Sequence, residues 1–302
     1  MSDSVAAATA AKSQPPGRSP WREALARLLH DRAALGGLAV IALMVAAAAL
    51  GAGLWPHKAD VAFHDRLSIA PTFANLHWLG TDAEGRDVGA RLLLGTGITW
   101  LAGALAALVS LIIGVAWGAI AGLSAGPIDG LMTRIVRGLA VIPLLFFVIL
   151  LVVVTPTDGP EQDLLLVAGA IGATQWLEIA RVMRDRTSAL RRIAYVEAAR
   201  AAGASRRQIV FRHIVPNIAG DVLVLAMRRL KLAILTESFL SFLGVGVKAP
   251  LASLGLLIAQ GAREMETAPW TLMAPALVLA VMLIAVSLAA DGLRDALEAR
   301  ER

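Results

Sequence analysis

The stretch LLLGTGITWLAGALAALVSLIIGVAWGAIAGLSAGPI, residues 92–128, carries no charge over 37 positions. A helix needs about 20 apolar residues to cross the hydrocarbon of a bilayer, at about 1.5 Å per residue. The stretch is too short for two crossings and a turn, so it predicts one long or tilted membrane-spanning helix with a short segment leading into it. The composition of the chain agrees, because 57% of its 302 residues are hydrophobic and only 17% are charged.

Five further stretches complete an expected all-α polytopic membrane protein with six transmembrane helices. The expected spans besides 92–128 are residues 33–54, 138–157, 164–180, 221–247 and 267–290. The polar start of the chain has no apolar core, which argues against a cleaved signal peptide and favours a tail outside the membrane. An even number of spans places both ends of the chain on one side.

The positions of arginine and lysine predict which side that is, because short loops rich in these residues stay cytoplasmic. With both ends inside, 19 of the 28 fall in inner segments and six in outer ones. We therefore expect a protein embedded in membrane lipid with both termini in the cytoplasm, and this positive-inside topology accounts for the net charge of +5 better than binding to nucleic acid does. The expected layout is a cytoplasmic tail 1–32, a first span 33–54, a periplasmic segment 55–91, a core 92–291 that includes a cytoplasmic loop 181–216, and a cytoplasmic tail 292–302.

The longest inner loop ends in YVEAARAAGASRRQIVFRHIVP, residues 195–216, which predicts two helices joined by a sharp turn. The first helix is expected to stop at Gly203, a residue that adopts the left-handed conformation favoured at helix ends. Ser205 and Gln208 then form a capping box in which each side chain satisfies a backbone donor of the other. Pro216 is expected to end the second helix before the next span.

The surface of this loop combines small and charged side chains. Ala198, Ala199, Ala201 and Ala202 leave the backbone accessible, and Glu197, Arg200, Arg206 and Arg207 surround them with charge. Such a surface suits insertion into a groove on a soluble partner. The alternative is an ordinary basic loop that only sets the topology.

Four motifs, which occur along the chain in the order expected for one family, resemble motifs of that family. Glu197, Ala198, Ala199, Gly203, Ile214 and Pro216 are similar to the EAA…G…I…P cytoplasmic motif of permease subunits of bacterial ATP-driven importers, with Val215 where leucine is common. LGTDAEGRDVGARLLLG (79–95, with Ala90 where serine is usual), LSFLGVGV (240–247) and DGLRDALE (291–298) resemble stretches of the dipeptide, oligopeptide and nickel permeases. The chain is therefore similar, over residues 78–298, to the C-type inner-membrane permease of this ABC importer family.

The resemblance implies the type I ABC importer permease fold, with this chain as half of a translocation pore for peptides or similar small solutes. It implies a heterodimer with a second permease subunit, two ATP-binding subunits, and a periplasmic or surface substrate-binding protein. The ATPase-coupling residues would be Glu197, Ala198, Ala199, Arg200, Gly203, Ser205, Arg206, Arg207, Ile214 and Pro216. The sequence has no GxxxxGK[ST] loop, so we expect no cofactor on this chain and assign ATP and Mg²⁺ to the partner subunits.

Charges within the expected fifth span need an explanation. They are Arg228, Arg229, Lys231 and Glu237, and charge at such depth costs roughly 2.5–3.5 kcal/mol per residue. The three cations cover an arc of about 160° of the helix, so they cannot all face lipid. Either they line the translocation path and attract an anionic part of the cargo, such as a peptide carboxylate, or the helix starts deeper in the cytoplasm and the cations snorkel or pair with a partner subunit.

Two features of the outer segment 55–91 allow more than one interpretation. His57, Asp60 and His64 share helical spacing and could hold a metal, although loop residues without a metal are favoured and no metal site is expected. The segment 55–91 contacts the binding protein, forms a lid, or packs against the partner permease.

Two other functional classes would each require specific features in the sequence. A stand-alone secondary transporter or channel would need coupling-ion groups near mid-membrane and usually an internal repeat, and the sequence shows neither. A membrane enzyme would need a catalytic constellation, and the five histidines form no HExxH arrangement, so we expect no enzymatic activity.

Overall fold

The computed structural model describes residues 20–73, 75–124, 126–191, 193, 201–205, 208 and 215–298, and the regular elements in these ranges are all helices. This confirms the all-α expectation. The elements are α2 (Pro20–Leu28), α3 (Arg32–Leu54), α4 (Val88–Leu123), α5 (Pro127–Leu139), α6 (Leu144–Val154), α7 (Pro160–Arg191), α10 (Val215–Phe242), α11 (Leu254–Glu264) and α12 (Pro269–Glu298).

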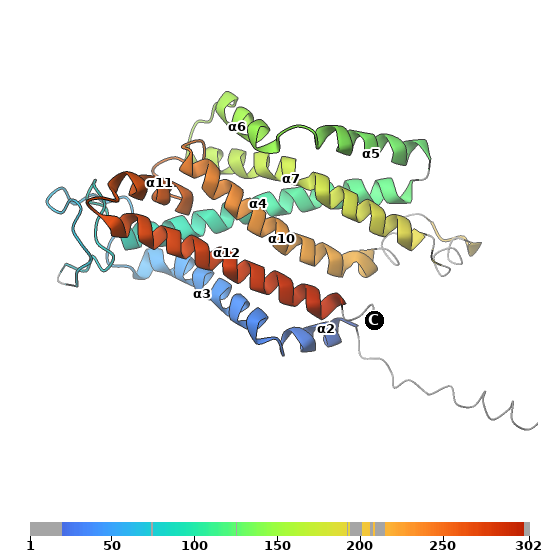
Figure 1. Ribbon diagram of the computed structural model, residues 1–302, viewed down its shortest axis with the longest axis horizontal. Coiled ribbons are helices and arrows are strands. Elements are labelled where there is room, and N and C mark those ends of the chain that lie inside the picture. The colour runs from blue at the N-terminus through green and yellow to red at the C-terminus, as the bar shows by residue number, and fades with distance from the viewer. Residues whose placement is uncertain are drawn as a thin grey trace, which may run out of the picture.

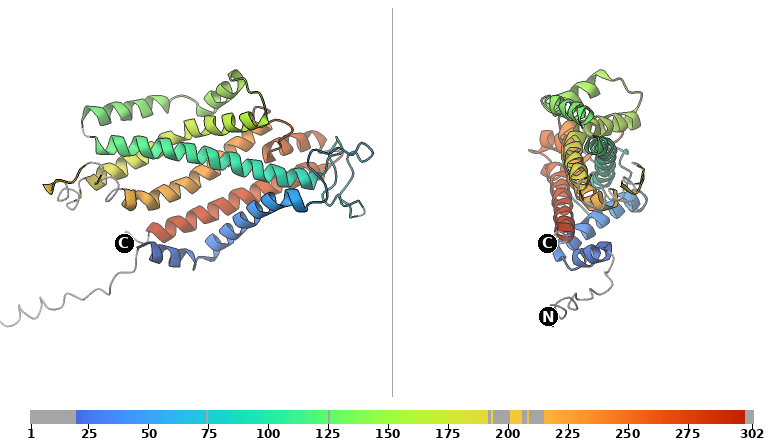
Figure 2. Two further views of the ribbon diagram at one scale, coloured as in Figure 1. Left: turned by 180° about the vertical axis from the view of Figure 1, so that it is seen from behind. Right: turned by 90° about the vertical axis from the view of Figure 1, so that its right-hand side faces the viewer.

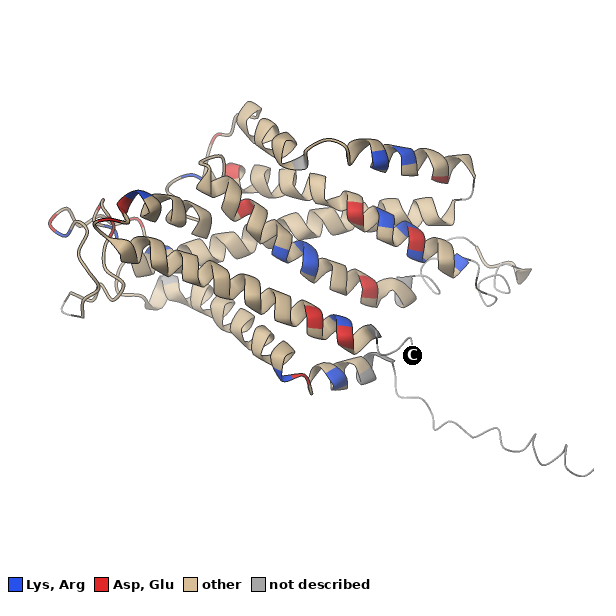
Figure 3. Cartoon of the chain, viewed as in Figure 1, with Lys and Arg blue, Asp and Glu red and all other residues tan. Residues whose placement is uncertain are grey.

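The long helices lie side by side along the longest axis of the molecule (Figure 1). Residues 55–87 gather at one end, which we call the collar end, and the end of α7 and the start of α10 lie at the opposite end, which we call the loop end. The two further views place α5 and α6 on one flank and α2 and α3 on the other (Figure 2). Charged residues lie mainly in the collar and in the loop-end halves of the helices (Figure 3).

Helix α4 confirms that the charge-free stretch forms a single helix. It is 36 residues long, and it begins four residues earlier and ends five residues earlier than expected. The Asp87 carboxylate begins it by accepting a hydrogen bond from the backbone N–H of Ala90, 2.7 Å away. Asp31 begins α3 in the same way, accepting from the backbone of Ala33 and Ala34.

Helices α4 and α7 form the tightest pair of the bundle, and small residues make the approach possible. Gly114, Gly118 and Gly122 face α7 at four-residue spacing, and a Cβ at any of them would lie 2.5–2.6 Å from an atom of α7. This is the small-xxx-small pattern of membrane helices that pack backbone to backbone. Successive glycines of α4 contact successively later residues of α7, so the two helices run in the same direction.

A parallel pair requires the chain to return along the bundle between them. Helices α5 and α6 make this return in two pieces, laid end to end beside α4 and α7 (Figure 1). The expected continuous span 138–157 is therefore wrong in detail, because the helix breaks over residues 140–143. At 11 residues, about 16 Å, α6 alone is too short to cross a bilayer.

The described residues contain four helices that are long and apolar enough to cross a membrane: Arg32–Gly51, Val88–Leu123, Pro160–Arg191 and Pro269–Leu297. They contain the expected spans one, two, four and six in whole or large part. Helix α10 has the length of a span, at 28 residues, but it carries the charges noted above.

Helix α10 starts earlier than expected. Pro216 is the second residue of this helix; the helix expected before it lies outside the described residues, so its end at Pro216 stays a prediction. A proline in the first turn of a helix costs nothing, because the backbone N–H that it lacks would have no partner inside the helix.

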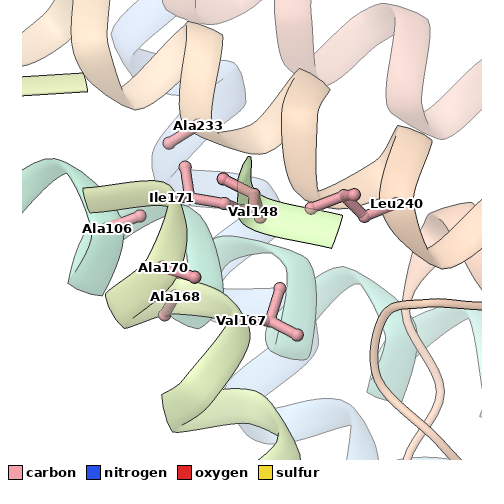
Figure 4. Close-up of a cluster of buried hydrophobic side chains, with 8 residues drawn as sticks. All are labelled: Ala106, Val148, Val167, Ala168, Ala170, Ile171, Ala233 and Leu240. Atoms are coloured by element: carbon pink, nitrogen blue, oxygen red, sulfur yellow. The ribbon is translucent and has the colours of Figure 1, made fainter. Parts of the chain in front are cut away.

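A small-residue core holds four helices together (Figure 4). Its buried members are Ala106 of α4, Val148 of α6, Val167, Ala168, Ala170 and Ile171 of α7, and Ala233 and Leu240 of α10. Val148 is the buried α6 side chain of this core, and the half-buried Ile149, Leu151 and Val152 of α6 pack against it as well.

Candidate functional site

The corner of the inner loop is built as the sequence predicts. Gly203 has a φ of +87°, in the left-handed region that favours glycine. The backbone N–H of Ser205 donates to Gln208 Oε1 (2.8 Å), and the backbone N–H of Gln208 donates to Ser205 Oγ (3.2 Å). Both halves of the expected capping box are therefore present directly after Gly203.

The corner is also open. A Cβ added at Gly203 would have no other atom within 4 Å, and Ala201 and Ala202 are exposed. Most of the expected coupling residues lie outside the described residues, namely Glu197, Ala198, Ala199, Arg200, Arg206, Arg207 and Ile214. Their coupling role stays a prediction.

Helices α7 and α10 run antiparallel and meet in a row of polar contacts that we call the polar seam. Arg186 Nε lies 3.2 Å from Asp221 Oδ2, Arg229 Nη2 lies 2.6 Å from Glu178 Oε2, and Gln175 Nε2 donates to Thr236 Oγ1 at 3.4 Å. The pairing could not be predicted from the sequence, since no local pattern links Glu178 to a partner 51 positions away. The seam shows why charge is tolerated in α10: Arg229 is 7% exposed and paired across the helix interface.

The four charges singled out in α10 point in different directions. Arg229 is paired in the seam, and Glu237 is fully buried, where Ser241 Oγ donates to its Oε1 at 2.7 Å. Arg228 and Lys231 are exposed. Among the four residues expected on the translocation path, only these two present their side chains to the outside of this chain, and the path assignment stays a prediction.

A hollow of about 550 Å³ opens at the loop end between α7, α10 and α12. Its charged lining is mixed: Glu178, Arg186, Asp221, Arg228 and Arg294. The hollow therefore lies directly beside the polar seam, because Glu178, Arg186 and Asp221 belong to both.

The collar is organised around buried Asp82. Its carboxylate accepts hydrogen bonds from Arg91 Nη1 (2.7 Å), Arg86 Nε (2.9 Å) and the backbone N–H of Arg86 (2.8 Å). Arg91 is buried as well, so the ion pair is shielded from water. Gly80 and Gly85 allow the chain to turn here: both have positive φ, and a Cβ would lie 2.5 Å from Ile69 O and 2.3 Å from Phe63 O respectively.

The collar is tied to the C-terminal third of the chain. The Ala83 backbone N–H donates to Glu264 Oε2 of α11 at 3.2 Å, and Trp270 Nε1 of α12 donates to Thr81 O at 3.3 Å. Burial raises the pKa of the Glu264 carboxyl above its ordinary value of 4.5. The glycine-rich motif 79–95 thus has a structural role that its spacing alone does not reveal.

A second buried group of the collar is His77 and Asp87. His77 Nδ1 lies 2.8 Å from Asp87 Oδ2, Trp55 Nε1 donates to Asp87 Oδ1 at 2.8 Å, and Arg66 Nη1 lies 3.4 Å from His77 Nε2. His57 stacks on His77 with ring centroids 4.2 Å apart.

This second group is the arrangement of the described residues that most resembles a metal centre, because His57, His77 and Asp87 offer ligand atoms within 4.8 Å of one another. The atoms of His77 and Asp87 are already engaged, however, and Arg66 places a cation against the second ring nitrogen of His77. The donor set therefore forms a hydrogen-bonded brace and does not fit a metal. Asp60 and His64, the other members of the trio in the sequence, are not part of it.

Comparison with known proteins gives this geometry a context. Residues 114–302 match the family model described as binding-protein-dependent transport system inner membrane component, and residues 19–71 match the N-terminal TM domain of oligopeptide transport permease C. The chain is 40% identical over 286 residues to the oligopeptide transport system permease protein OppC of Haemophilus influenzae, covering 95% of this chain and 90% of the relative.

Two further relatives agree. The Escherichia coli K12 protein of the same name is 40% identical over 290 residues, covering 95% of this chain and 93% of the relative. The dipeptide transport system permease protein DppC of Bacillus subtilis is 34% identical over 288 residues, covering 95% and 88%. The chain therefore belongs to the family of binding-protein-dependent inner-membrane transport components: it is a multi-pass membrane permease subunit of an ABC importer and not an enzyme.

Proposed function

We propose that this subunit forms half of a translocation pore for oligopeptides or similar small solutes, in a heterodimer with a second permease subunit. Two ATP-binding subunits, which hold the ATP and Mg²⁺, and a periplasmic or surface substrate-binding protein complete the importer. The relatives named for oligopeptide and dipeptide transport support this cargo class. The observation that carries the proposal is the exposed corner at Gly203, Ser205 and Gln208 in a chain without an ATP-binding loop.

The proposed topology is six crossings with both ends in the cytoplasm. Helices α3, α4, the broken pair α5 and α6, α7, α10 and α12 traverse the bundle in alternating directions, and α2 and the end of α12 lie together at the loop end (Figure 1). The excess of arginine at that end supports a cytoplasmic location for residues 1–32, 181–216 and 292–302. Residues 55–91 would then be periplasmic, where the collar offers a surface to the binding protein.

The corner is proposed to be the coupling element. Its alanines allow close approach of the ATPase, and Glu197, Arg200, Arg206 and Arg207 would supply charge around the contact. It precedes α10 directly, and α10 is joined to α7 through the polar seam. A displacement of the corner would therefore be passed to both helices as a rigid-body movement.

Reconstitution in liposomes tests this function directly. The chain with its partner permease and ATPases should accumulate peptide only when ATP is supplied, and the purified chain alone should neither accumulate peptide nor hydrolyse ATP. Transport by the chain alone, driven by an ion gradient, would contradict the proposal and favour a secondary transporter.

Arg228 and Lys231 give a prediction about cargo. As the exposed cations of α10, they are proposed to attract the C-terminal carboxylate of a peptide. Replacing both with alanine should reduce uptake of free-acid peptides several-fold while leaving amidated peptides nearly unchanged. Competition between the two peptide forms in whole cells measures this preference. Equal discrimination by the variant and the original chain would remove these cations from the path.

A further inference from the structure

Glu237 of α10 has no part in the proposed coupling at the corner. Its side chain is fully buried, and it forms no ion pair within the described part of the chain. Its partners are hydroxyl groups: Ser241 Oγ donates to Oε1 at 2.7 Å, and Ser238 Oγ donates to Oε2 at 3.4 Å. A buried carboxylate is costly unless hydrogen bonds satisfy it, so these hydroxyls hold the carboxylate in one position.

The same carboxylate faces α4 and the start of α11. The hydroxyls of Thr99 on α4 and Ser253 at the cap of α11 interact with it as well, and both side chains are fully buried. The backbone N–H of Leu254 donates to Thr99 Oγ1 at 3.0 Å. The backbone N–H of Leu256 donates to Ser253 Oγ at 3.3 Å. The first turn of α11 is therefore attached to α4 and α10 through the hydroxyl groups around Glu237.

The backbones of α10 and α11 are also in direct contact at this point. A Cβ at Gly255, in the first turn of α11, would lie 2.0 Å from the backbone oxygen of Ser238. The loop between the two helices is held in the same way, because the Val247 N–H donates to Ser241 Oγ at 3.3 Å. Close-packed groups transmit displacement, so a movement of α10 here would move the start of α11 with it.

The other end of α11 is attached to the collar. Glu264, its last residue, accepts a hydrogen bond from the Ala83 N–H at 3.2 Å, and a Cβ at Gly261 would lie 2.5 Å from the backbone of Thr271 in α12. Helix α11 lies at the collar end, beside the end of α10 and the start of α12 (Figure 1). Its 11 residues, about 16 Å long, therefore connect the buried carboxylate of α10 with the collar.

We propose that Glu237 is the positioning residue that fixes α11 against α10, so that a movement of α10 reaches the collar through α11. The inference rests on the proposed function, in which the corner before α10 binds the ATPase and the collar faces the binding protein. Coupling between two sites is reciprocal, so a binding protein on the collar would alter ATP hydrolysis through the same contacts. Glu237 would act in this way without touching the cargo.

Hydrogen exchange of the purified full-length chain tests the attachment without transport. Glu237→Gln keeps the shape of the side chain and replaces one acceptor oxygen with a donor, so the first turn of α11 should open more readily. The amides of Leu254, Leu256 and Ala83 should exchange at least about tenfold faster, because a hydrogen bond to a charged group contributes that much.

Glu266→Gln is the matched control, because it changes a glutamate in the exposed turn after α11. It should leave exchange at these amides as it is in the original chain. Thr99→Val is a second variant that removes the acceptor of the Leu254 N–H, and it should also speed exchange there. Thermal unfolding of every variant identifies any that has lost its fold.

ATP hydrolysis by the assembled importer tests the transmission. The binding protein, purified with its own bound peptide, is added to importer in nanodiscs, and the ratio of stimulated to basal hydrolysis is measured. This ratio should be at least about fivefold lower for Glu237→Gln than for the original chain. A general loss of structure would lower both rates alike and leave the ratio unchanged.

The two measurements separate the possible failures. Original rates of exchange in α11 and the collar of a folded Glu237→Gln chain would overturn the attachment. Faster exchange confined to the first turn of α11, or an unchanged hydrolysis ratio, would overturn the transmission to the collar. An original importer that the binding protein does not stimulate would contradict the proposed function instead, and hydrogen exchange would still decide on the attachment.

Discussion

Replacing Asp82 with alanine is expected to lower the free energy of unfolding of the purified chain by about 3–5 kcal/mol. The variant would leave Arg91 buried without its counterion, and four donors would lose their acceptor: the backbone N–H groups of Glu84 and Arg86, Arg86 Nε and Arg91 Nη1. Breaking one side of a buried, hydrogen-bonded pair is costly because the remaining charge stays away from water. The loss should appear as early unfolding of the collar in a denaturant titration in detergent.

Two control variants distinguish the effect of an unpaired buried charge from the effect of losing an ion pair as such. The double variant Asp82→Asn, Arg91→Gln removes both charges and keeps polar groups in place, so it should recover much of the loss. Glu84→Gln should cost less than about 1 kcal/mol, because its ion pair with Arg86 is at the surface. An Asp82→Ala variant that unfolds within about 0.5 kcal/mol of the original chain would show that the pair does not hold the collar.

Features encoded by neighbouring residues could be predicted from the sequence. The single helix α4 follows from the absence of charge over residues 92–128, and the corner follows from Gly203, Ser205 and Gln208 within six positions. Each depends on local chemistry: apolar length in the first case and backbone capping in the second.

Features that depend on packing could not be predicted in the same way. The break between α5 and α6 lies in a run as apolar as a continuous span, and its one local signal is Pro143, which disfavours helix in the residue before it. The pairing of Glu178 with Arg229 depends on the register of two antiparallel helices. The pairing of Asp82 with Arg91 depends on how the collar lies against the start of α4.

Replacing Gly203 with valine is expected to weaken docking of the ATPase by about tenfold. A left-handed conformation costs an L-residue roughly 1–2 kcal/mol, and each 1.4 kcal/mol is tenfold in affinity. The free loop can relax to avoid the strain, since nothing surrounds the Gly203 Cβ position, so the cost falls on the docked state. Accumulation of peptide should fall with docking.

Gly203→Asn is the matched control for this change. Asparagine tolerates the left-handed conformation better than any β-branched residue, so a variant with it should retain most of the coupling despite the larger side chain. Equal losses with asparagine and valine would mean that the partner needs the empty space at this position and not the backbone conformation.

The central claim is that this subunit is driven by a separate ATPase that binds the corner around Gly203. Affinity purification of the assembled importer, with the ratio of ATPase to permease quantified for the original chain, Gly203→Asn and Gly203→Val, tests it most directly. The ratio should be high for the first two proteins and about tenfold lower for Gly203→Val under dilute conditions. Full retention of the ATPase and of peptide accumulation by a folded Gly203→Val importer would contradict the claim.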